Sequence, residues 1–181
     1  MSEGVVTVDL RSLDLSRGAA VRLRLRVPPV ALRLGGQDYV GDPSEPEADL
    51  EVSRSLAGLH FGLRLHAELV GPCWRCVGPA RLAVHVDATE YVADGRSPED
   101  PFDEDLDSAY LEATRLDVGL WARDAIAESL PAVVLCRDDC AGLCPECGID
   151  RNVATCDCAA APTDSRWDAL RELSERLGPS E

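Results

Sequence analysis

Apolar and polar residues alternate at every second position through much of the first half of the chain. In residues 19–27, three arginines take alternate positions between aliphatic residues. A period of two places these two kinds of side chain on opposite faces of a β-strand. By this pattern, strands are expected at residues 4–10, 19–27, 49–56, 59–70 and 80–92. The Gly-, Asp- and Pro-rich residues 35–49 indicate a loop. We therefore expect an antiparallel sheet over residues 1–93, which could curl into a barrel.

A helical period replaces this alternation in the second half of the chain. Asp117 can cap a helix, and Pro131 ends it. Apolar residues mark one face of this helix, at Val118, Trp121, Ala122 and Ala125. A second helix is expected to begin near Asp164. Its apolar residues recur at spacings of three or four, at Trp167, Leu170, Leu173 and Leu177.

An acidic stretch separates the two halves. Residues 94–112 hold eight acidic residues and one arginine, which is typical of a solvated loop or linker. A docking segment for a basic partner is the alternative. The predicted fold class is α+β, with an antiparallel β domain at 1–93 and the linker or loop at 94–112. In residues 113–181 we expect helices that flank a cysteine-rich module and pack on the sheet.

Charge and hydropathy narrow the functional classes. The formal net charge is −15, which opposes attraction to nucleic-acid phosphates, so DNA binding is not expected and a basic protein is the more natural partner. No stretch approaches the roughly 20 apolar residues of a transmembrane helix. The first residues lack the basic and apolar segments of a signal peptide. We therefore expect a cytoplasmic protein that does not enter the membrane.

Cysteine is the most informative residue type in this chain. Cytosolic proteins rarely keep disulfides, which favours metal binding. A Cys-x-x-Cys motif brings two sulfurs to one ion from a single turn, and zinc favours four thiolates. "CWRCVG" and "CPECG" have this form, and Gly78 and Gly148 let the backbone pass the second sulfur. The sequence thus predicts structural Zn²⁺, as one or two ions, on Cys73, Cys76, Cys136, Cys140, Cys144, Cys147, Cys156 and Cys158.

The grouping of these cysteines stays open at this stage. One division places the last four around one ion and joins Cys73 and Cys76 to Cys136 and Cys140 around another. A single zinc ion with the remaining thiols free or redox-active is the alternative. An iron–sulfur cluster is a further possibility. So is a redox pair at Cys73 and Cys76, although no thioredoxin-like βαβ pattern surrounds them.

The residues do not indicate an enzyme. All-cysteine zinc sites are typically closed and structural. Structural roles account best for the histidines in the expected strands, at His60, His66 and His85. The alternating arginines could meet RNA phosphates, or form a solvated face that balances acidic residues; they are Arg22, Arg24 and Arg26.

Several motifs follow one another in a recognisable order. "GPCWRCVGPARL" precedes the acidic stretch, and the helix "LDVGLWARDAIAESLP" follows it. Next come "LCRDDCAGLCPECGIDRN", "CDC" and "DSRWDALREL". This order resembles the YceD family of large ribosomal RNA subunit accumulation proteins, in its cysteine-rich Gram-positive form. The resemblance covers roughly residues 10–177 and is most specific in the Cys-x-x-Cys motif, the "GLCPxCG" box and the terminal "DxRWxxL".

The resemblance implies a role in the synthesis, processing or stability of 23S ribosomal RNA. Family genes often neighbour the gene of a small ribosomal protein of the large subunit, and no enzymatic activity is attached to the family. We therefore expect a non-enzymatic zinc-binding factor in large-subunit assembly. Its partner would be a basic ribosomal protein or a ribosomal RNA precursor. A zinc-ribbon or redox-responsive regulatory protein is the alternative.

Overall fold

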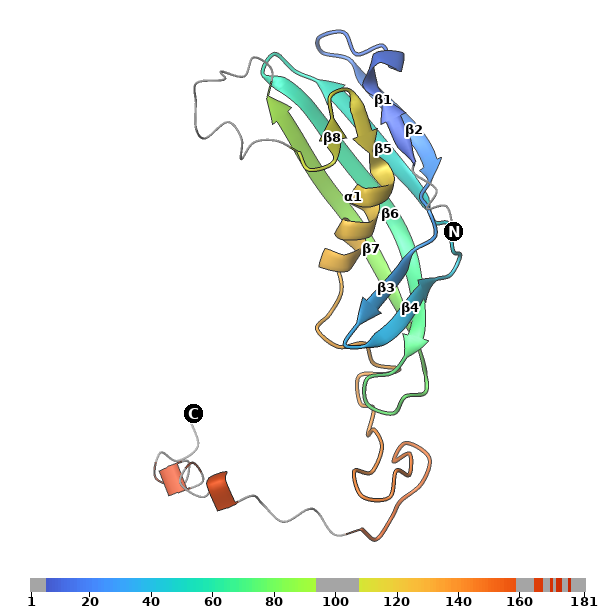
Figure 1. Ribbon diagram of the computed structural model, residues 1–181, viewed down its shortest axis with the longest axis vertical. Helices are drawn as coiled ribbons and strands as arrows, with labels where there is room; N and C mark the ends of the chain where they lie inside the picture. Colours follow the sequence, from blue (N-terminus) through green and yellow to red (C-terminus); the bar gives the residue numbers. More distant parts are fainter. Residues whose placement is uncertain are drawn as a thin grey trace. The chain divides into compact units, whose positions relative to one another are not determined.

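The computed structural model describes residues 6–93, 108–158, 165–167, 170, 172–173 and 176 of the chain. The chain forms two compact units, Met1–Cys140 and Ala141–Glu181. The first unit contains strands β1 (Thr7–Asp9), β2 (Ala20–Arg26), β3 (Ala31–Leu34), β4 (Gln37–Gly41), β5 (Glu47–Arg54), β6 (Gly58–Pro72), β7 (Pro79–Ala93), β8 (Leu111–Glu112) and β9 (Arg115–Asp117), a short 3₁₀ helix (Leu10–Ser12) and helix α1 (Val118–Glu128) (Figure 1).

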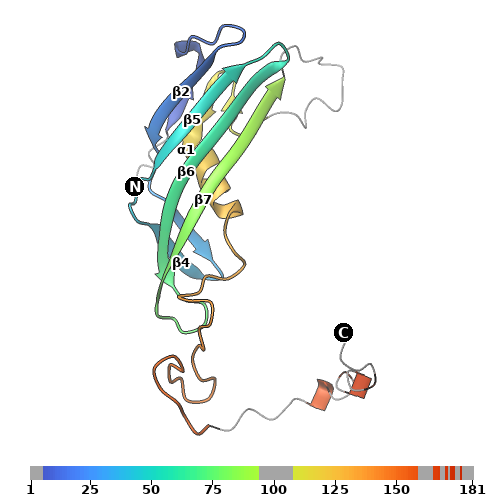
Figure 2. The same cartoon turned by 180° about the vertical axis from the view of Figure 1, so that it is seen from behind.

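The larger sheet is built around the long hairpin of β6 and β7. These two strands pair antiparallel from Gly58 and Ala93 to Pro72 and Pro79. On its other edge, β6 pairs first with β5 and then, further along, with β4. Strand β2 extends the sheet beyond β5, and β3 extends it beyond β4. Figure 2 shows β2, β5, β6 and β7 side by side, with α1 behind them.

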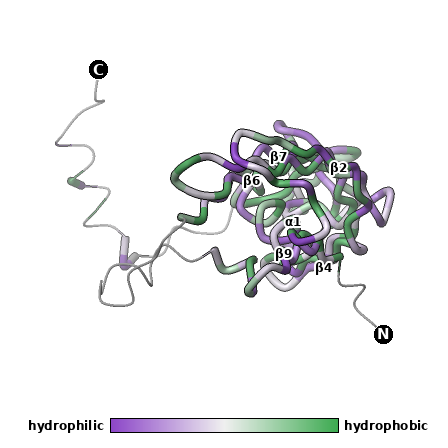
Figure 3. Tube along the Cα trace, turned by 90° about the horizontal axis from the view of Figure 1, so that it is seen from above, coloured by the Kyte–Doolittle hydropathy of each residue, from purple (hydrophilic) through white to green (hydrophobic). Residues whose placement is uncertain are grey.

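One face of this sheet forms the core of the first unit. Along β6, apolar residues at every second position are buried, namely Phe61, Leu63, Leu65, Ala67 and Leu69. Hydrophilic and hydrophobic residues are interspersed through this unit (Figure 3). Helix α1 covers the apolar face together with a small sheet of order β1-β9-β8. The predicted period of two is therefore confirmed.

The prediction that the sheet could curl into a barrel is wrong. Among the described residues, the six strands form an open sheet, and β7 pairs only with β6. Closure is one way to cover an apolar sheet face. Here α1 and the β1-β9-β8 sheet cover that face instead, and Trp121 of α1 is only 2% exposed.

Residues 35–49, predicted as a loop, contain strand β4 and the start of β5. Strands β3 and β4 form a hairpin whose turn is Gly35-Gly36, and both glycines have positive φ, at 55° and 83°. Two such residues form the tight turn that matches the twist of paired strands. The glycines therefore mark a hairpin turn. Tyr39 of β4 is buried, and its hydroxyl donates to the Pro72 carbonyl at 2.8 Å.

Helix α1 confirms the prediction for the segment after Asp117. The Asp117 side chain accepts a hydrogen bond from the Leu120 N–H at 2.9 Å. Val118, Trp121, Ala122 and Ala125 are all buried. The second predicted helix, from near Asp164 to Leu177, falls largely outside the described residues; Ser165–Trp167 is a short 3₁₀ helix. Helices flanking the cysteine module therefore stay a prediction.

The acidic segment lies mostly outside the described residues, from 94 to 107. The three-part division at residues 93 and 112 stays a prediction. None of the helices in the described ranges is long and apolar enough to cross a membrane.

Candidate metal centres

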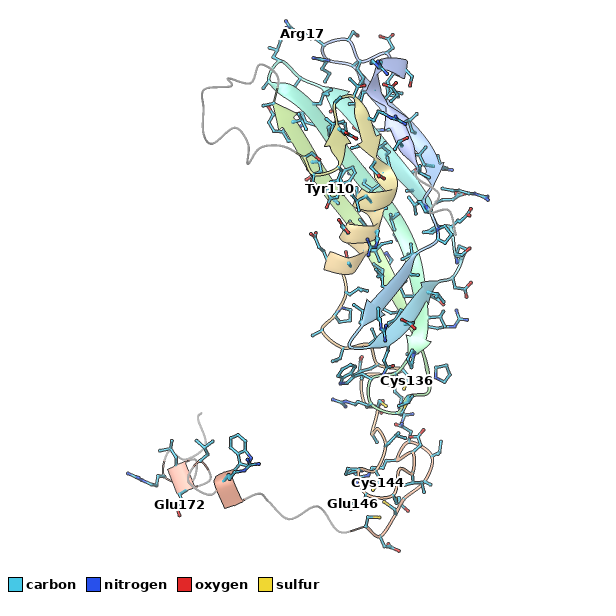
Figure 4. All side chains as sticks on the ribbon, viewed as in Figure 1. Arg17, Tyr110, Cys136, Cys144, Glu146 and Glu172 are labelled. Carbon is cyan, nitrogen blue, oxygen red and sulfur yellow. The ribbon has the colours of Figure 1, made fainter. Side chains whose placement is uncertain are left out.

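The first cysteine cluster joins two segments that are distant in sequence. Cys73 and Cys76 lie in the turn between β6 and β7, and Cys136 and Cys140 follow α1. Their four sulfur atoms all lie within 4.8 Å of one another. Cys73 Sγ is 3.8 Å from Cys140 Sγ, and Cys76 Sγ is 3.7 Å from Cys136 Sγ. Figure 4 labels Cys136 at this end of the sheet.

Backbone hydrogen bonds fold residues 73–78 into a compact knuckle. The Cys73 N–H donates to the Gly78 carbonyl at 2.7 Å, and the Val77 N–H donates to the Cys73 carbonyl at 3.0 Å. The left-handed position is Val77, with φ of 60°. Gly78 follows Val77 without a positive φ, and a Cβ added there would lie 3.4 Å from Cys76 Sγ. A β-branched residue is unfavourable at positive φ, so the turn is strained at Val77.

The segment after α1 is held against this knuckle by two further hydrogen bonds. The Trp74 N–H donates to the Val134 carbonyl at 2.8 Å. The Arg75 guanidinium donates to the Cys140 carbonyl at 2.9 Å. Cys73 and Cys140 are both buried, whereas Cys136 is exposed. The cluster therefore lies at the rim of the core, with one side open to solvent.

The thiols of this cluster differ in pKa because they lie close together. Burial raises the pKa of Cys73, but the N–H groups of Cys76, Cys136 and Arg75 outweigh it and bring the pKa to about 6. Burial and the neighbouring sulfurs raise the pKa of Cys136 to about 12. A thiolate at one of these cysteines thus disfavours the ionisation of a second, as expected where four thiols share a small volume. A cation placed among them would relieve this repulsion.

The second cluster belongs wholly to the second unit. The sulfur atoms of its four cysteines also lie within 4.8 Å of one another, from Cys144, Cys147, Cys156 and Cys158. Residues 144–149 repeat the first knuckle. The Cys144 N–H donates to the Ile149 carbonyl at 2.8 Å, and the Gly148 N–H donates to the Cys144 carbonyl at 2.9 Å. Gly148 has φ of 74°, so here the predicted role of glycine is confirmed.

Backbone donors and a cation act on the sulfurs of the second cluster. The N–H groups of Cys147 and Glu146 lower the pKa of Cys144 to about 6. The Arg151 guanidinium donates to Cys144 Sγ at 3.7 Å. Hydrogen bonds to Cys147 and Cys156, with burial, raise the pKa of Cys158 to about 12. The sequence motif did not indicate Arg151 or Arg75, because neither lies at a ligand position.

The histidines and the arginine strand contribute no ligand to either cluster and lie on the sheet face opposite α1. His66 and His85 are opposite one another on β6 and β7, and their Nδ1 atoms are 2.5 Å apart. The arginines of β2 form ion pairs with β5: Arg22 with Glu51 at 2.8 Å, Arg24 with Asp49 at 3.1 Å and Arg26 with Glu47 at 3.9 Å.

The fold and the two clusters define a protein with two four-cysteine centres, each able to hold a metal ion, one of which is anchored on an antiparallel sheet. The model of the YceD family, described as large ribosomal RNA subunit accumulation protein YceD, matches residues 61–174. This range spans both clusters and more than half of the chain. The chain belongs to the YceD family.

Relatives in mycobacteria support this assignment. The uncharacterized proteins Rv2926c of Mycobacterium tuberculosis strain H37Rv and Mb2951c of Mycobacterium bovis are each 32% identical to the chain over 181 residues, which cover 96% of it and 82% of each relative. The uncharacterized protein ML1660 of Mycobacterium leprae is 28% identical over 144 residues, 79% of this chain and 66% of that protein. No solved structure matches the chain.

Proposed function

We propose that this protein is a non-enzymatic zinc-binding factor in the synthesis, processing or stability of 23S ribosomal RNA and in large-subunit assembly. The observation that carries the proposal is the family match, whose description names large ribosomal RNA subunit accumulation. The matched range contains all eight cysteines. The part of the chain that matches the family is thus also the part that carries both cysteine clusters.

Zinc is the metal that the donor sets fit best. In a tetrahedron with metal–sulfur bonds of about 2.3 Å, neighbouring sulfurs are about 3.8 Å apart. Two sulfur pairs of the first cluster, at 3.8 and 3.7 Å, match this edge. An all-thiolate set is typical of closed, structural zinc sites. We therefore assign one structural ion to each cluster and no catalytic role to either.

A basic protein is the partner that the charges favour. The chain carries a net charge of −15, and thiolate clusters filled with zinc would make it more negative. The carboxylates of β5 lie within 4.0 Å of the β2 arginines, so that strand pair presents little net positive charge to RNA phosphates. These observations favour a basic ribosomal protein over direct RNA contact. They also suit action in the cytoplasm, where ribosomes assemble.

The ribosomal role can be tested in a deletion strain. We expect a lower ratio of 23S to 16S ribosomal RNA and fewer large subunits than small ones. The wild-type gene should restore both, and a Cys73→Ser, Cys144→Ser double variant should not. Normal subunit ratios in the deletion strain, under fast growth and under cold stress, would overturn the ribosomal assignment. A pull-down with and without nuclease then separates a protein partner from an RNA partner.

A further inference from the structure

A hollow lies between β7 and α1 in the first unit, and none of its lining residues is a cysteine. Its volume is about 280 Å³, and its walls include Glu90 of β7, Trp121 and Glu128 of α1, and Tyr110. This is at the small end of ligand pockets, which run from about 300 to 1,000 Å³. The size suits a single side chain better than a free cofactor. Figure 4 labels Tyr110 beside α1.

The aromatic wall of this hollow is held firmly in place. The rings of Tyr110 and Trp121 stack, with centroids 6.0 Å apart and planes at 23°. The Asp117 N–H donates to the Tyr110 carbonyl at 2.8 Å, which ties Tyr110 to the residue that caps α1. Trp121 is buried and Tyr110 only partly so. The phenol therefore offers a preformed surface on which a planar cation can stack.

The charge that lines the hollow is negative. Besides burial, the pKa of Tyr110 is raised by the carboxylates of Asp124, Glu128 and Glu90. Across the described ranges, no arginine forms an ion pair with any of these three carboxylates, whereas Asp87 on the opposite face of β7 pairs with Arg64 at 3.3 Å. Residues 94–107 of the chain hold seven acidic residues and one arginine. Charge complementarity therefore points to a cationic occupant from another molecule.

The hollow opens along an available strand edge. Within the described part of the chain, β7 pairs with β6 on one side and with no strand on the other. Residues 86–90 of β7 line the hollow. An unpaired edge of this kind offers backbone donors and acceptors to an added strand. Strand edge and acidic pocket thus lie side by side.

We propose that this edge binds an extended, arginine- or lysine-bearing segment of a basic protein. The segment pairs with β7 at residues 86–90, and one of its cationic side chains enters the hollow. There the side chain stacks on Tyr110 and meets the carboxylates of Glu90 and Glu128. The ribosomal identity of the partner rests on the proposed function; the binding chemistry does not.

The test uses the full zinc-loaded chain and a short synthetic peptide in which arginine alternates with valine. Affinity is measured by titration calorimetry at low and at physiological ionic strength. The pocket variant is Glu90→Gln with Glu128→Gln. The matched control is Asp14→Asn with Glu45→Gln, which changes the net charge equally at exposed carboxylates elsewhere. A peptide with citrulline in place of arginine keeps the shape of the side chain and removes its charge.

We expect the pocket variant to weaken binding about tenfold or more, and the control to change it less than about threefold. The citrulline peptide should lose affinity about as much as the pocket variant does. In hydrogen exchange, the arginine peptide should protect every second amide of residues 86–90, because alternate amides of a strand face the same edge. Intact circular dichroism spectra show that the variants fold.

Equal losses in the pocket and control variants would overturn the proposal, since they would show attraction to net charge alone. So would protection elsewhere than on β7, or the absence of binding. The outcome is separate from that of the ribosomal test. If the deletion strain has reduced 23S RNA but the protein does not bind the peptide, this inference is refuted and the proposed function is retained. If the protein binds the peptide but subunit ratios in the deletion strain are normal, the proposed function is refuted and this inference is retained.

Discussion

Replacing Cys140 by Ser should destabilise the whole first unit. Cys140 is buried at the rim of the core, and with Cys73, Cys76 and Cys136 it forms the cluster that ties the β6–β7 turn to the segment after α1. The variant removes one of four ligands and leaves a hydroxyl in a buried position. We expect the first metal ion to be lost, and with it the link between these two segments.

The magnitude follows from the length of chain that the cluster closes. Cys76 and Cys136 are 60 residues apart, and Cys73 and Cys140 are 67 residues apart. By the chain-entropy relation for cross-links, closing a loop of this size stabilises by about 4 kcal/mol. The second cluster closes much shorter loops, since Cys147 and Cys156 differ by nine positions. It should contribute about 2–3 kcal/mol, and only to the second unit.

Urea unfolding at a fixed free zinc concentration measures this contrast, with circular dichroism reporting the sheet. Cys156→Ser is the matched control, because it removes one ligand of the second cluster only. We expect Cys140→Ser to lower the free energy of unfolding of the sheet by about 4 kcal/mol, and the control to change it by less than about 1 kcal/mol. Equal effects of the two variants, or no effect of Cys140→Ser, would refute the conclusion that the first cluster links the β6–β7 turn to the segment after α1.

Four further outcomes follow from local geometry and from the acidity of the thiols. Val77→Gly should raise the stability of the first unit by about 1 kcal/mol in calorimetry, because the relief of backbone strain exceeds the cost of the added chain entropy. Gly148→Val should lower the zinc affinity of the second cluster in a zinc competition assay, because valine is unfavourable at positive φ. Asp117→Ala should cost about 1 kcal/mol of unfolding free energy in urea, because it removes the cap of α1. Zinc affinity should fall as the pH falls, because a thiol must lose its proton to bind zinc. The raised pKa of Cys136 keeps that thiol protonated, so zinc binding releases its proton. Below about pH 6 the thiol of Cys73 is protonated as well and must also release a proton. A chelator competition from about pH 6 to 8 that gave a constant affinity would contradict this last expectation.

Local patterns predicted the elements whose partners are close in sequence. The alternation along β6 and the cap at Asp117 both depend on neighbouring residues, so the strand and helix α1 could be read directly. Strand β4 could not, because Gly35 and Gly36 indicate a turn equally well in a loop and in a hairpin. The open sheet was missed because its cover, α1, lies far from the strands in sequence. Only the three-dimensional structure shows what packs on an apolar face.

The sequence offered the observed grouping of the cysteines as one of two alternatives, but it could not decide between them. The structure brings the sulfur atoms together in two groups of four, as the first alternative had it. The β6–β7 hairpin brings Cys73 and Cys76 to the segment after α1, which is a long-range effect of the sheet. Val77 was also missed, because a valine at positive φ has no sequence signal.

The hollow beside Tyr110 has no sequence motif at all. Glu90 and Glu128 are separated by the acidic segment and by the β8–β9 turn, and they meet only because α1 packs along β7. Acidic residues of this kind look like ordinary solvated positions in the sequence. Their shared location beside a strand edge and an aromatic ring is the basis for the proposed binding site.

Metal content tests the central claim most directly, that the chain holds two separate four-thiolate metal centres. Native mass spectrometry and elemental analysis of the protein purified from its native host should give two zinc ions per chain. Cys73→Ser and Cys144→Ser should each retain one ion, and the double variant none. One ion per wild-type chain with four reactive thiols, or the loss of both ions from either single variant, would contradict the account.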